Sequence, residues 1–503
     1  MVSKTEKIMS IAQNRGFFYP SGEIYSIKAG FWTYGHLGTL LKQRWENLWR
    51  ETFLGLNPNY YEIDDVNIMT KEVFESSGHL KNFNDPLVEC TKCKLRFRAD
   101  QYIEDQTGKE TEGLTTSQLD DLISKNKLKC PECGSQLGKT KLFNMMFELK
   151  VGATGKDIMY LRPETAQSPY LAFKRQFTSL REKLPMGLAV IGKAFRNEIS
   201  PRQGFFRLRE FTQAELQIFF DKDKIDESQE WNKIKDYKIR TFLVSDRKSS
   251  KVKERTLSQL NKLKIPKFYL QHLAEIQKFY LETLKIPKSN FRFRELSEKE
   301  RAFYNKIHFD IEANLETSGK FIELGGVHYR GEHDLGGHQA GSKTKLEVVV
   351  DGKRFVPHVL ELSFGVDRNI WALLDFFFRE EKERTLFTFP YSLSPIEVAI
   401  FPLVRKDNLP KIAKEIFDEL KKDFKCSYDE TGSIGKMYRR MDEVGCSIMI
   451  TVDHETLKNK TVTIRDRDSM KQTRIKIKDL KEKISDLFSG KIKFEKTGKL
   501  LKN

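Results

Sequence analysis

The stretch from Gly192 to Phe220, GKAFRNEISPRQGFFRLREFTQAELQIFF, predicts two β-strands joined by a charged loop. Successive side chains of a strand point to opposite faces of a sheet. One face of the second strand should therefore carry Leu208, Thr212, Ala214, Leu216 and Ile218. The other face should carry the polar row Arg207, Arg209, Phe211, Gln213, Glu215 and Gln217. In the first strand, the same rule groups Ala194, Arg196 and Glu198.

The polar row suits a nucleotide that binds across an antiparallel sheet. Arginines make paired hydrogen bonds to phosphate oxygens. Phe211 offers a flat surface to a planar base, and Glu198 can accept a hydrogen bond from an exocyclic amino group. The alternative is a solvated sheet face with cross-strand ion pairs, which alternating charges alone would also produce.

The exact sequence of this stretch favours the nucleotide site over the solvated face. FRNEISPRQGFFRLREFTQAE, from Phe195 to Glu215, resembles the second signature motif of class II aminoacyl-tRNA synthetases. Within that class it is similar to the dimeric glycyl-tRNA synthetases, which share the pattern FRNEISPRxGxxRxREFxQAE. The resemblance implies an α+β fold with an antiparallel sheet flanked by helices, insertions, and a C-terminal α/β domain that binds the anticodon. It also implies a ligase that makes glycyl-adenylate from glycine and ATP with Mg²⁺ and transfers glycine to the 3' end of its tRNA.

Length and composition fit a soluble enzyme with a polyanionic partner. The 503 residues are enough for two or three domains. The excess of 88 Lys and Arg over 71 Asp and Glu gives a net charge of +17, which attracts nucleic acid, although a lysine-rich composition bias would give the same excess. The sequence contains no 18-residue apolar run, and its first residues lack the apolar core of a signal peptide. We therefore expect a cytoplasmic protein without a membrane segment.

Four of the six cysteines form two pairs, Cys90-Thr-Lys-Cys93 and Cys130-Pro-Glu-Cys133. Each pair places two thiolates on one tight turn, and two such turns supply the tetrahedral sulfur set that zinc prefers. The 36 residues between the pairs exceed the gap of common zinc ribbons, so free thiols or a redox pair remain the alternative. A closed four-sulfur site predicts a structural zinc that stabilises an insertion, with the chemistry elsewhere.

The N-terminal part predicts a long amphipathic helix. Leu37, Leu41, Trp45 and Trp49 recur at helical spacing. The resemblance makes this region the first class II motif, which builds the interface of a homodimer. Farther on, Ser77-Gly78-His79 predicts a loop with a locally satisfied histidine and no catalytic role.

The resemblance implies residues for both substrates. For glycine, they are Arg98, Glu164 of Arg-Pro-Glu-Thr-Ala-Gln, Phe211, Thr212, Gln213, Ala214, Glu215, Glu361, Leu362, Ser363, Phe364 and Gly365. For ATP, they are Arg196, Asn197, Glu198, Phe206, Arg207, Leu208, Arg209, Glu210, Phe211, Glu323, Leu324, Gly365, Val366, Asp367 and Arg368. Arg196 and Arg368 are the expected catalytic pair, and Glu323 is the expected magnesium ligand. On physical grounds alone, Glu164 would be a carboxylate at a helix start.

The remaining segments predict two insertions and a second domain. Residues 89–138 hold the cysteine pairs, and residues 221–305, which contain no glycine, read as a mainly helical insertion. We expect the catalytic domain over 1–388 and the anticodon-binding domain over 389–503, where strands alternate with helices. Its candidate tRNA contacts are Lys436, Arg439, Arg440, Arg465 and Arg467, with ion pairing to neighbouring carboxylates as the competing account.

Two other functions stay open at this point. A class II synthetase for proline, threonine or serine would share Arg196 and Arg368. Only the expected acidic pocket and the Arg-Pro-Glu-Thr-Ala-Gln motif argue against such an enzyme. A non-catalytic relative, such as a polymerase accessory subunit, would keep the fold but is expected to lose the phosphate-binding arginines. Both arginines are present here.

Overall fold

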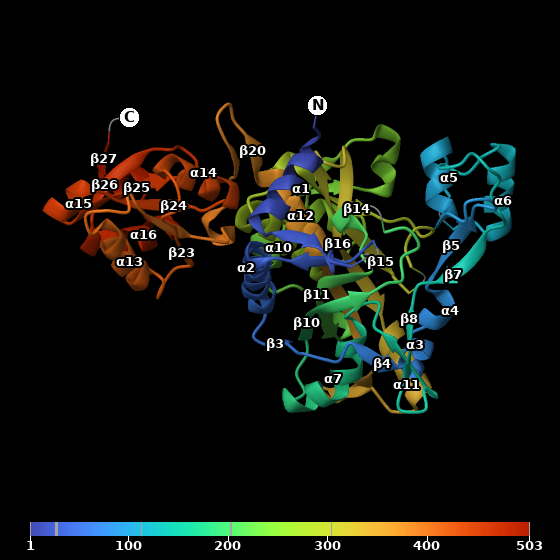
Figure 1. Ribbon diagram of the computed structural model, residues 1–503. Helices are drawn as coiled ribbons and strands as arrows, with labels where there is room; N and C mark the ends of the chain where they lie inside the picture. The colour runs from blue at the N-terminus through green and yellow to red at the C-terminus, as the bar shows by residue number, and fades with distance from the viewer. Residues whose placement is uncertain (1, 26–28, 112, 202–203, 303, 502–503) are drawn as a thin grey trace.

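The computed structural model describes residues 2–25, 29–111, 113–201, 204–302 and 304–501. A nine-stranded sheet forms its centre, in the order β13-β12-β14-β15-β16-β19-β11-β10-β3 (Figure 1). The six strands from β14 to β10 pair antiparallel throughout, as predicted. The bounds of the nine strands are β3 Tyr60–Glu62, β10 Met186–Phe195, β11 Glu210–Phe220, β12 Lys238–Phe242, β13 Lys253–Thr256, β14 Phe291–Glu295, β15 Ile307–Leu315, β16 Lys320–Gly331 and β19 His358–Gly365.

The alternation along β11 divides the sheet into an apolar face and a polar face. Ala214, Leu216 and Ile218 join the main hydrophobic core, where they meet the helices α2 (His36–Phe53), α10 (Lys267–Lys278) and α12 (Val366–Phe377). A π-helical turn, Phe279–Thr283, continues α10. Gln213, Glu215 and Gln217 point to the opposite face, where they are also buried. On that second face, α7 (Gln167–Ser179) packs over one end of the sheet.

Two predictions for this region need correction. Arg207 and Arg209 are not part of a strand, because a 3-10 turn at Gly204–Phe206 precedes them and β11 begins only at Glu210. Residues 221–305 are mainly helical, as expected, but the prediction missed three strands. Their strands β12, β13 and β14 extend the central sheet, while α8 (Trp231–Ile234), α9 (Leu257–Lys262) and α10 cover them.

The cysteine pairs lie in a small module beside the catalytic sheet. Its strands β5 (Asn84–Glu89), β6 (Arg96–Arg98) and β7 (Lys141–Asn144) pack on α5 (Ala99–Thr107) and α6 (Thr116–Lys125) around a core of their own. A neighbouring three-stranded sheet consists of β4 (Ile68–Thr70), β9 (Asp157–Leu161) and β8 (Phe147–Val151). Near it lie α3 (Lys71–Ser76), α4 (His79–Asn82) and α11 (His333–Ser342) (Figure 1).

The C-terminal part has a separate six-stranded sheet, in the order β23-β22-β24-β25-β26-β27. One face packs against α13 (Leu409–Leu420) and α16 (Leu480–Phe488), and the other against α14 (Ile434–Val444). Its strands are β22 Val398–Pro402, β23 Cys426–Tyr428, β24 Ile448–Val452, β25 Thr461–Asp466, β26 Gln472–Lys476 and β27 Lys499–Leu500, and α15 spans His454–Asn459. This part and the cysteine module lie on opposite sides of the central sheet (Figure 1).

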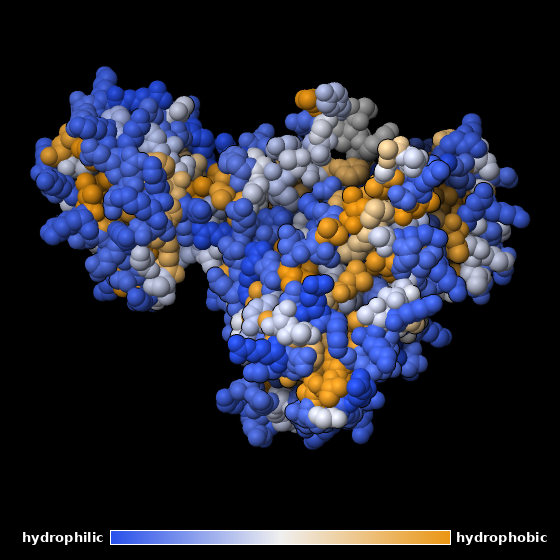
Figure 2. Space-filling view, turned by 90° about the horizontal axis from the view of Figure 1, so that it is seen from below, coloured by the Kyte–Doolittle hydropathy of each residue, from blue (hydrophilic) through white to orange (hydrophobic). Residues whose placement is uncertain are grey.

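The remaining elements are short or peripheral. The N-terminal helix α1 (Lys4–Arg15) reaches the C-terminal part, where Arg15 forms an ion pair with Glu443. The paired strands are β1 Phe18–Pro20 with β2 Trp32–Tyr34, β17 Val348–Val350 with β18 Lys353–Phe355, and β20 Phe378–Glu380 with β21 Thr385–Phe387. No helix of the described residues is long and apolar enough to cross a membrane. On the face shown in Figure 2, hydrophilic residues dominate and hydrophobic residues gather in patches.

Candidate active site

A cavity opens on the polar face of the central sheet, over β11, β16 and β19. Most of the predicted substrate residues line it: Glu164, Arg196, Glu198, Phe206, Arg207, Leu208, Phe211, Thr212, Gln213, Glu215, Glu323, Leu324, Glu361, Ser363, Gly365, Asp367 and Arg368. The fold therefore brings together residues from four separate parts of the sequence. Glu164 and Glu361 lie around Arg330 at one end of the cavity, with Glu215 nearby. At the other end, Arg207 and Arg368 lie beside Glu198 and Glu323. The two ends are called the acidic end and the basic end.

Glu215 lies at the acidic end and has only neutral partners. Its side chain accepts hydrogen bonds from Thr165 Oγ1 at 2.6 Å, Ser363 Oγ at 2.7 Å and Gln213 Nε2 at 2.8 Å. The residue is 2% exposed. Burial, and then the neighbouring carboxylate of Glu164, raise the pKa of Glu215. Among the described residues, no Lys or Arg forms an ion pair with it. A buried carboxylate of this kind provides a site for a cationic ligand.

Arg330 balances the other acidic groups. Its guanidinium donates to both oxygens of Asp334, at 2.7 and 2.8 Å, and to Glu361 Oε2 at 2.8 Å. Even so, burial raises the pKa of Glu361 to about 8, with Arg330 opposing the rise and Glu215 adding to it. Removing a partner from such a buried network leaves charges uncompensated. Arg330 thus stabilises the acidic end, a role that the sequence did not reveal.

Glu164 is anchored through one oxygen. Gln167 Nε2 donates to its Oε1 at 2.9 Å, while His79 Nε2 lies 3.5 Å and Arg330 3.8 Å from the same atom. Although burial opposes the effect, His79 and Arg330 lower the pKa of Glu164, so the side chain is ionised. The expected helix-start role is not observed, because α7 begins at Gln167 and its N-cap is Ala166.

Arg196 lies between two aromatic rings. Its guanidinium carbon is 5.2 Å from the centre of the Phe211 ring and 5.4 Å from that of Phe83. Its Nε donates to the carbonyl of Pro163 at 3.1 Å, just before Glu164. These contacts fix the positively charged guanidinium of Arg196 between the acidic end and the basic end of the cavity.

The basic end is built from two arginines that leave part of their hydrogen-bonding capacity unused. Arg368, on the first turn of α12, donates to the carbonyl of Phe206 at 3.2 Å and lies 3.1 Å from the carboxylate of Glu323. Arg207 donates to Gln101 Oε1 at 2.8 Å and lies 3.6 Å from Glu198. A guanidinium has five donors, so both can still bind phosphate oxygens.

Several predicted residues do not line the cavity. Arg98 forms ion pairs with Asp85 and Asp100 in the cysteine module. The side chains of Ala214, Leu362, Phe364 and Val366 belong to the hydrophobic core, while Asn197, Arg209 and Glu210 lie beside the cavity wall. Asp367 does reach it, but its carboxylate already accepts from Tyr34 Oη at 2.7 Å and from the backbone N–H of Thr212 at 2.5 Å.

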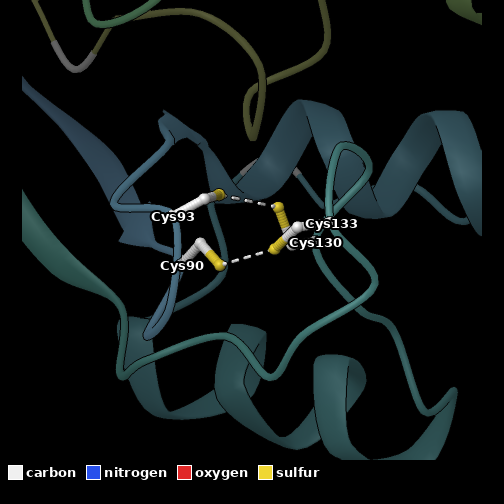
Figure 3. Close-up of side chains that lie close together, drawn as sticks. All are labelled: Cys90, Cys93, Cys130 and Cys133. Carbon is white, nitrogen blue, oxygen red and sulfur yellow. Dashed lines mark hydrogen bonds between the residues drawn. The ribbon is translucent and has the colours of Figure 1, made fainter.

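The four paired cysteines form one cluster, as predicted (Figure 3). All four sulfur atoms lie within 4.8 Å of one another, and two cross-pair distances, Cys90–Cys133 and Cys93–Cys130, are 3.5 Å. A tetrahedral zinc with Zn–S bonds of about 2.3 Å separates its sulfurs by roughly 3.8 Å. The donor set and its spacing are therefore compatible with zinc. Cys426 and Cys446 lie elsewhere and pack against the hydrophobic clusters of the C-terminal part.

The structure separates the predicted tRNA contacts into two groups. Lys436, Arg439 and Arg440 line a shallow hollow with Arg15 at the surface of α14. Arg465 and Arg467 are 4% and 1% exposed. Arg465 forms an ion pair with Asp442, and Arg467 donates to the carbonyls of Phe389 and Gly445. These two arginines are structural, in line with the competing account of ion pairing.

Comparisons with known proteins agree with this architecture. Residues 147–377 match the tRNA synthetase class II core domain of the G, H, P, S and T group, and residues 397–487 match an anticodon binding domain. A prolyl-tRNA synthetase from Cryptosporidium parvum, solved with L-proline and AMP, shares the fold, with a TM-score of 0.59 over 97% of this chain and 76% of that chain. Its sequence identity of 14% supports the fold alone.

Curated relatives match nearly the whole chain. The glycine–tRNA ligase of Thermococcus sibiricus is 36% identical, over 97% of this chain and 100% of the relative. The enzyme of the same name from Methanococcus maripaludis strain C7 is 34% identical, over 96% of this chain and 100% of the relative. With the class II core and the anticodon-binding fold both present, this chain belongs to the glycine–tRNA ligase family of class II aminoacyl-tRNA synthetases.

Proposed function

We propose that this chain activates glycine with ATP to form glycyl-adenylate and then transfers the glycyl group to the 3' end of tRNA(Gly). The observation that carries this proposal is Glu215, a buried carboxylate with three neutral donors and no cationic partner among the described residues. The ammonium group of glycine would supply the missing charge. Ser363 and Glu361 line the same end of the cavity and would complete a site for a small cation.

The crowded acidic end also accounts for the choice of amino acid. Glu164, Glu215 and Glu361 surround a small space. A larger apolar side chain would remove water from these carboxylates without replacing its hydrogen bonds, which is costly for charged groups. This argues for glycine over proline, serine or threonine within the class II group.

At the other end of the cavity, arginines would act on ATP. We assign Arg196 to the α-phosphate, where negative charge grows as the glycine carboxylate attacks, and Arg207 and Arg368 to the outer phosphates. Phe211 would stack on adenine. Mg²⁺ bound with ATP would neutralise phosphate charge, and the exposed carboxylate of Glu323 is its proposed ligand. Catalysis then rests on positioning and charge neutralisation, without a covalent enzyme intermediate.

Other parts of the chain would support this reaction. We assign a structural zinc to Cys90, Cys93, Cys130 and Cys133, and tRNA contacts to Lys436, Arg439 and Arg440. We place the catalytic domain at 1–388 and the anticodon-binding domain at 389–503, which is supported by their separate sheets and cores. A homodimer built on the first class II motif and a cytoplasmic location complete the proposal.

The test is amino-acid-dependent exchange of pyrophosphate into ATP. Exchange with glycine, but not with proline, serine, threonine or alanine, is the expected result. Exchange with another amino acid would contradict the assigned specificity, and no exchange at all, even with tRNA added, would favour a non-catalytic relative. Arg196→Ala should abolish adenylate formation while leaving folding and tRNA binding nearly intact. Loss of folding in that variant would mean that Arg196 is structural.

A further inference from the structure

One oxygen of Glu164 receives the side chain's anchoring contacts. Gln167, His79 and Arg330 all approach Oε1, from α7, α4 and β16 respectively. Among the described residues, no hydrogen bond or ion pair reaches Oε2, although the side chain lines the cavity. Anchoring one oxygen in this way leaves the other available to a ligand in the cavity.

His79 contributes to this anchor in a defined orientation. Its Nδ1 lies 2.8 Å from Ser77 Oγ, and its Nε2 faces Glu164. An ionised carboxylate can only accept hydrogen bonds, so Nε2 must carry the proton. The other ring nitrogen, Nδ1, is hydrogen-bonded to the hydroxyl of Ser77. The serine therefore fixes the ring so that its N–H points at Glu164.

The end of α3, three residues before His79, is held tightly against α11. A Cβ added at Gly337 would lie 2.7 Å from the carbonyl oxygen of Ser76, and one added at Gly341 would lie 2.0 Å from the Ser76 hydroxyl. Gly78 precedes the helix α4 with a φ of +80°, a conformation that favours glycine. His79 itself is 9% exposed, so the ring has little room to move away from Glu164.

His79 also contacts the group that supports Arg196. Its ring meets the ring of Phe83 at 5.7 Å, and the guanidinium of Arg196 lies over that same ring. The Nε2 atom of His79 thus faces Glu164, and the ring itself packs against Phe83. A substitution can therefore separate a polar role from a packing role.

We propose that His79 is a positioning residue for glycine, which holds Oε1 of Glu164 so that Oε2 faces the amino group of the substrate. This inference rests on the proposed role of Glu164 in the glycine pocket. His79 does not touch the substrate. Its contribution lies in limiting the carboxylate to one orientation before glycine arrives.

The test compares two amides at position 79 in the full chain. His79→Gln keeps a donor near the place of Nε2, whereas His79→Asn places its amide near Nδ1 and loses that donor. In pyrophosphate exchange, His79→Asn should raise KM for glycine about tenfold, the loss expected for one hydrogen bond to a charged group. KM for ATP should change less than about twofold on the same scale. His79→Gln should restore most of the glycine KM.

Two further variants separate the possible failures. If Glu164→Gln leaves KM for glycine unchanged, the proposed pocket itself is wrong. If Glu164→Gln raises it but His79→Asn does not, the pocket stands and the positioning role is overturned. Equal losses for His79→Asn and His79→Gln, with both KM values raised, would also overturn it in favour of packing. Ser77→Ala, which retains the ring, should raise KM for glycine in the same direction but less, and an unchanged KM would contradict the role of Ser77 in orienting the ring.

Discussion

Replacement of Glu215 by glutamine should weaken glycine binding without weakening the fold. The substitution keeps the shape of the side chain and removes its charge. In wild type, Oε1 accepts from Ser363 and Gln213, and Oε2 accepts from Thr165. A glutamine oxygen at the first position keeps two of these bonds, and its amide at the second can donate to the hydroxyl of Thr165, which can rotate to accept. No described hydrogen bond has to be lost.

The expected magnitudes follow from the lost charge. A hydrogen bond to a charged group contributes about 1.5–3 kcal/mol, so KM for glycine should rise about 10- to 150-fold. KM for ATP should change little, because the arginines proposed to bind its phosphates lie at the other end of the cavity. The neutral side chain also no longer pays the burial penalty that raises the pKa of Glu215. The melting temperature should therefore stay the same or rise.

The stability difference should depend on pH in a defined direction. A carboxyl group whose pKa is raised by folding carries no penalty well below its ordinary pKa of 4.5, where it is protonated in both states. The penalty appears as pH rises above that value. Any gain in melting temperature of Glu215→Gln over wild type should thus be largest at neutral pH and disappear in acid.

Pyrophosphate exchange and thermal unfolding measure both effects. Glu282→Gln, at an exposed site away from the cavity, is the matched control and should change neither quantity. An unchanged KM for glycine in Glu215→Gln would refute the assignment of this carboxylate to the substrate ammonium. A melting temperature several degrees lower would refute the claim that its charge is not needed for folding.

Three further results are expected from the same structure. Arg330→Ala should destabilise the chain by about 3–5 kcal/mol in urea unfolding, because it leaves Asp334 and Glu361 buried without a cation; a loss below about 1 kcal/mol would contradict this. The purified chain should release one zinc on treatment with a mercurial, and Cys93→Ser with Cys133→Ser should release none; a metal-free wild type would argue for free thiols. KM for glycine should fall as pH rises through about 8, because burial raises the pKa of Glu361 to that value and only the ionised form attracts an ammonium; Glu361→Gln should remove this slope.

The sequence predicted the sheet and the part of the polar row that lies on β11 because both depend on local periodicity. The alternation along β11 placed Ala214 and Leu216 in the core and Gln213 and Glu215 toward the cavity. The heavily charged strands β12 to β14 were mistaken for part of a helical insertion, since their charges resemble those of a solvated helix. They extend the edge of the sheet instead.

The unpredicted residues of the site depend on contacts between distant segments. Arg330, His79 and Gln167 meet at one atom of Glu164, and no local pattern indicates that meeting. No role was predicted for Arg330 from the sequence, because its partners lie far from it in the chain or on a different strand. For Arg465 and Arg467, a basic side chain in a tRNA-binding domain looks the same in sequence whether it is exposed or buried. The two cases are distinguished by contacts in the structure, with Asp442 for Arg465 and with the carbonyls of Phe389 and Gly445 for Arg467.

The cysteine module touches the loop between β10 and β11 directly. Ser200 Oγ donates to the carbonyl of Arg96 at 2.9 Å, and Arg207 donates to Gln101 at 2.8 Å. The module therefore supports the loop that carries Arg207, one of the arginines proposed to bind phosphate. A chimaera that carried this module from a relative would have to preserve both hydrogen bonds. Without them, the chain would fold but the loop would be less well positioned, and the proposed nucleotide binding would be weaker. Transferring the four cysteines alone would not position this loop, because neither hydrogen bond involves a cysteine.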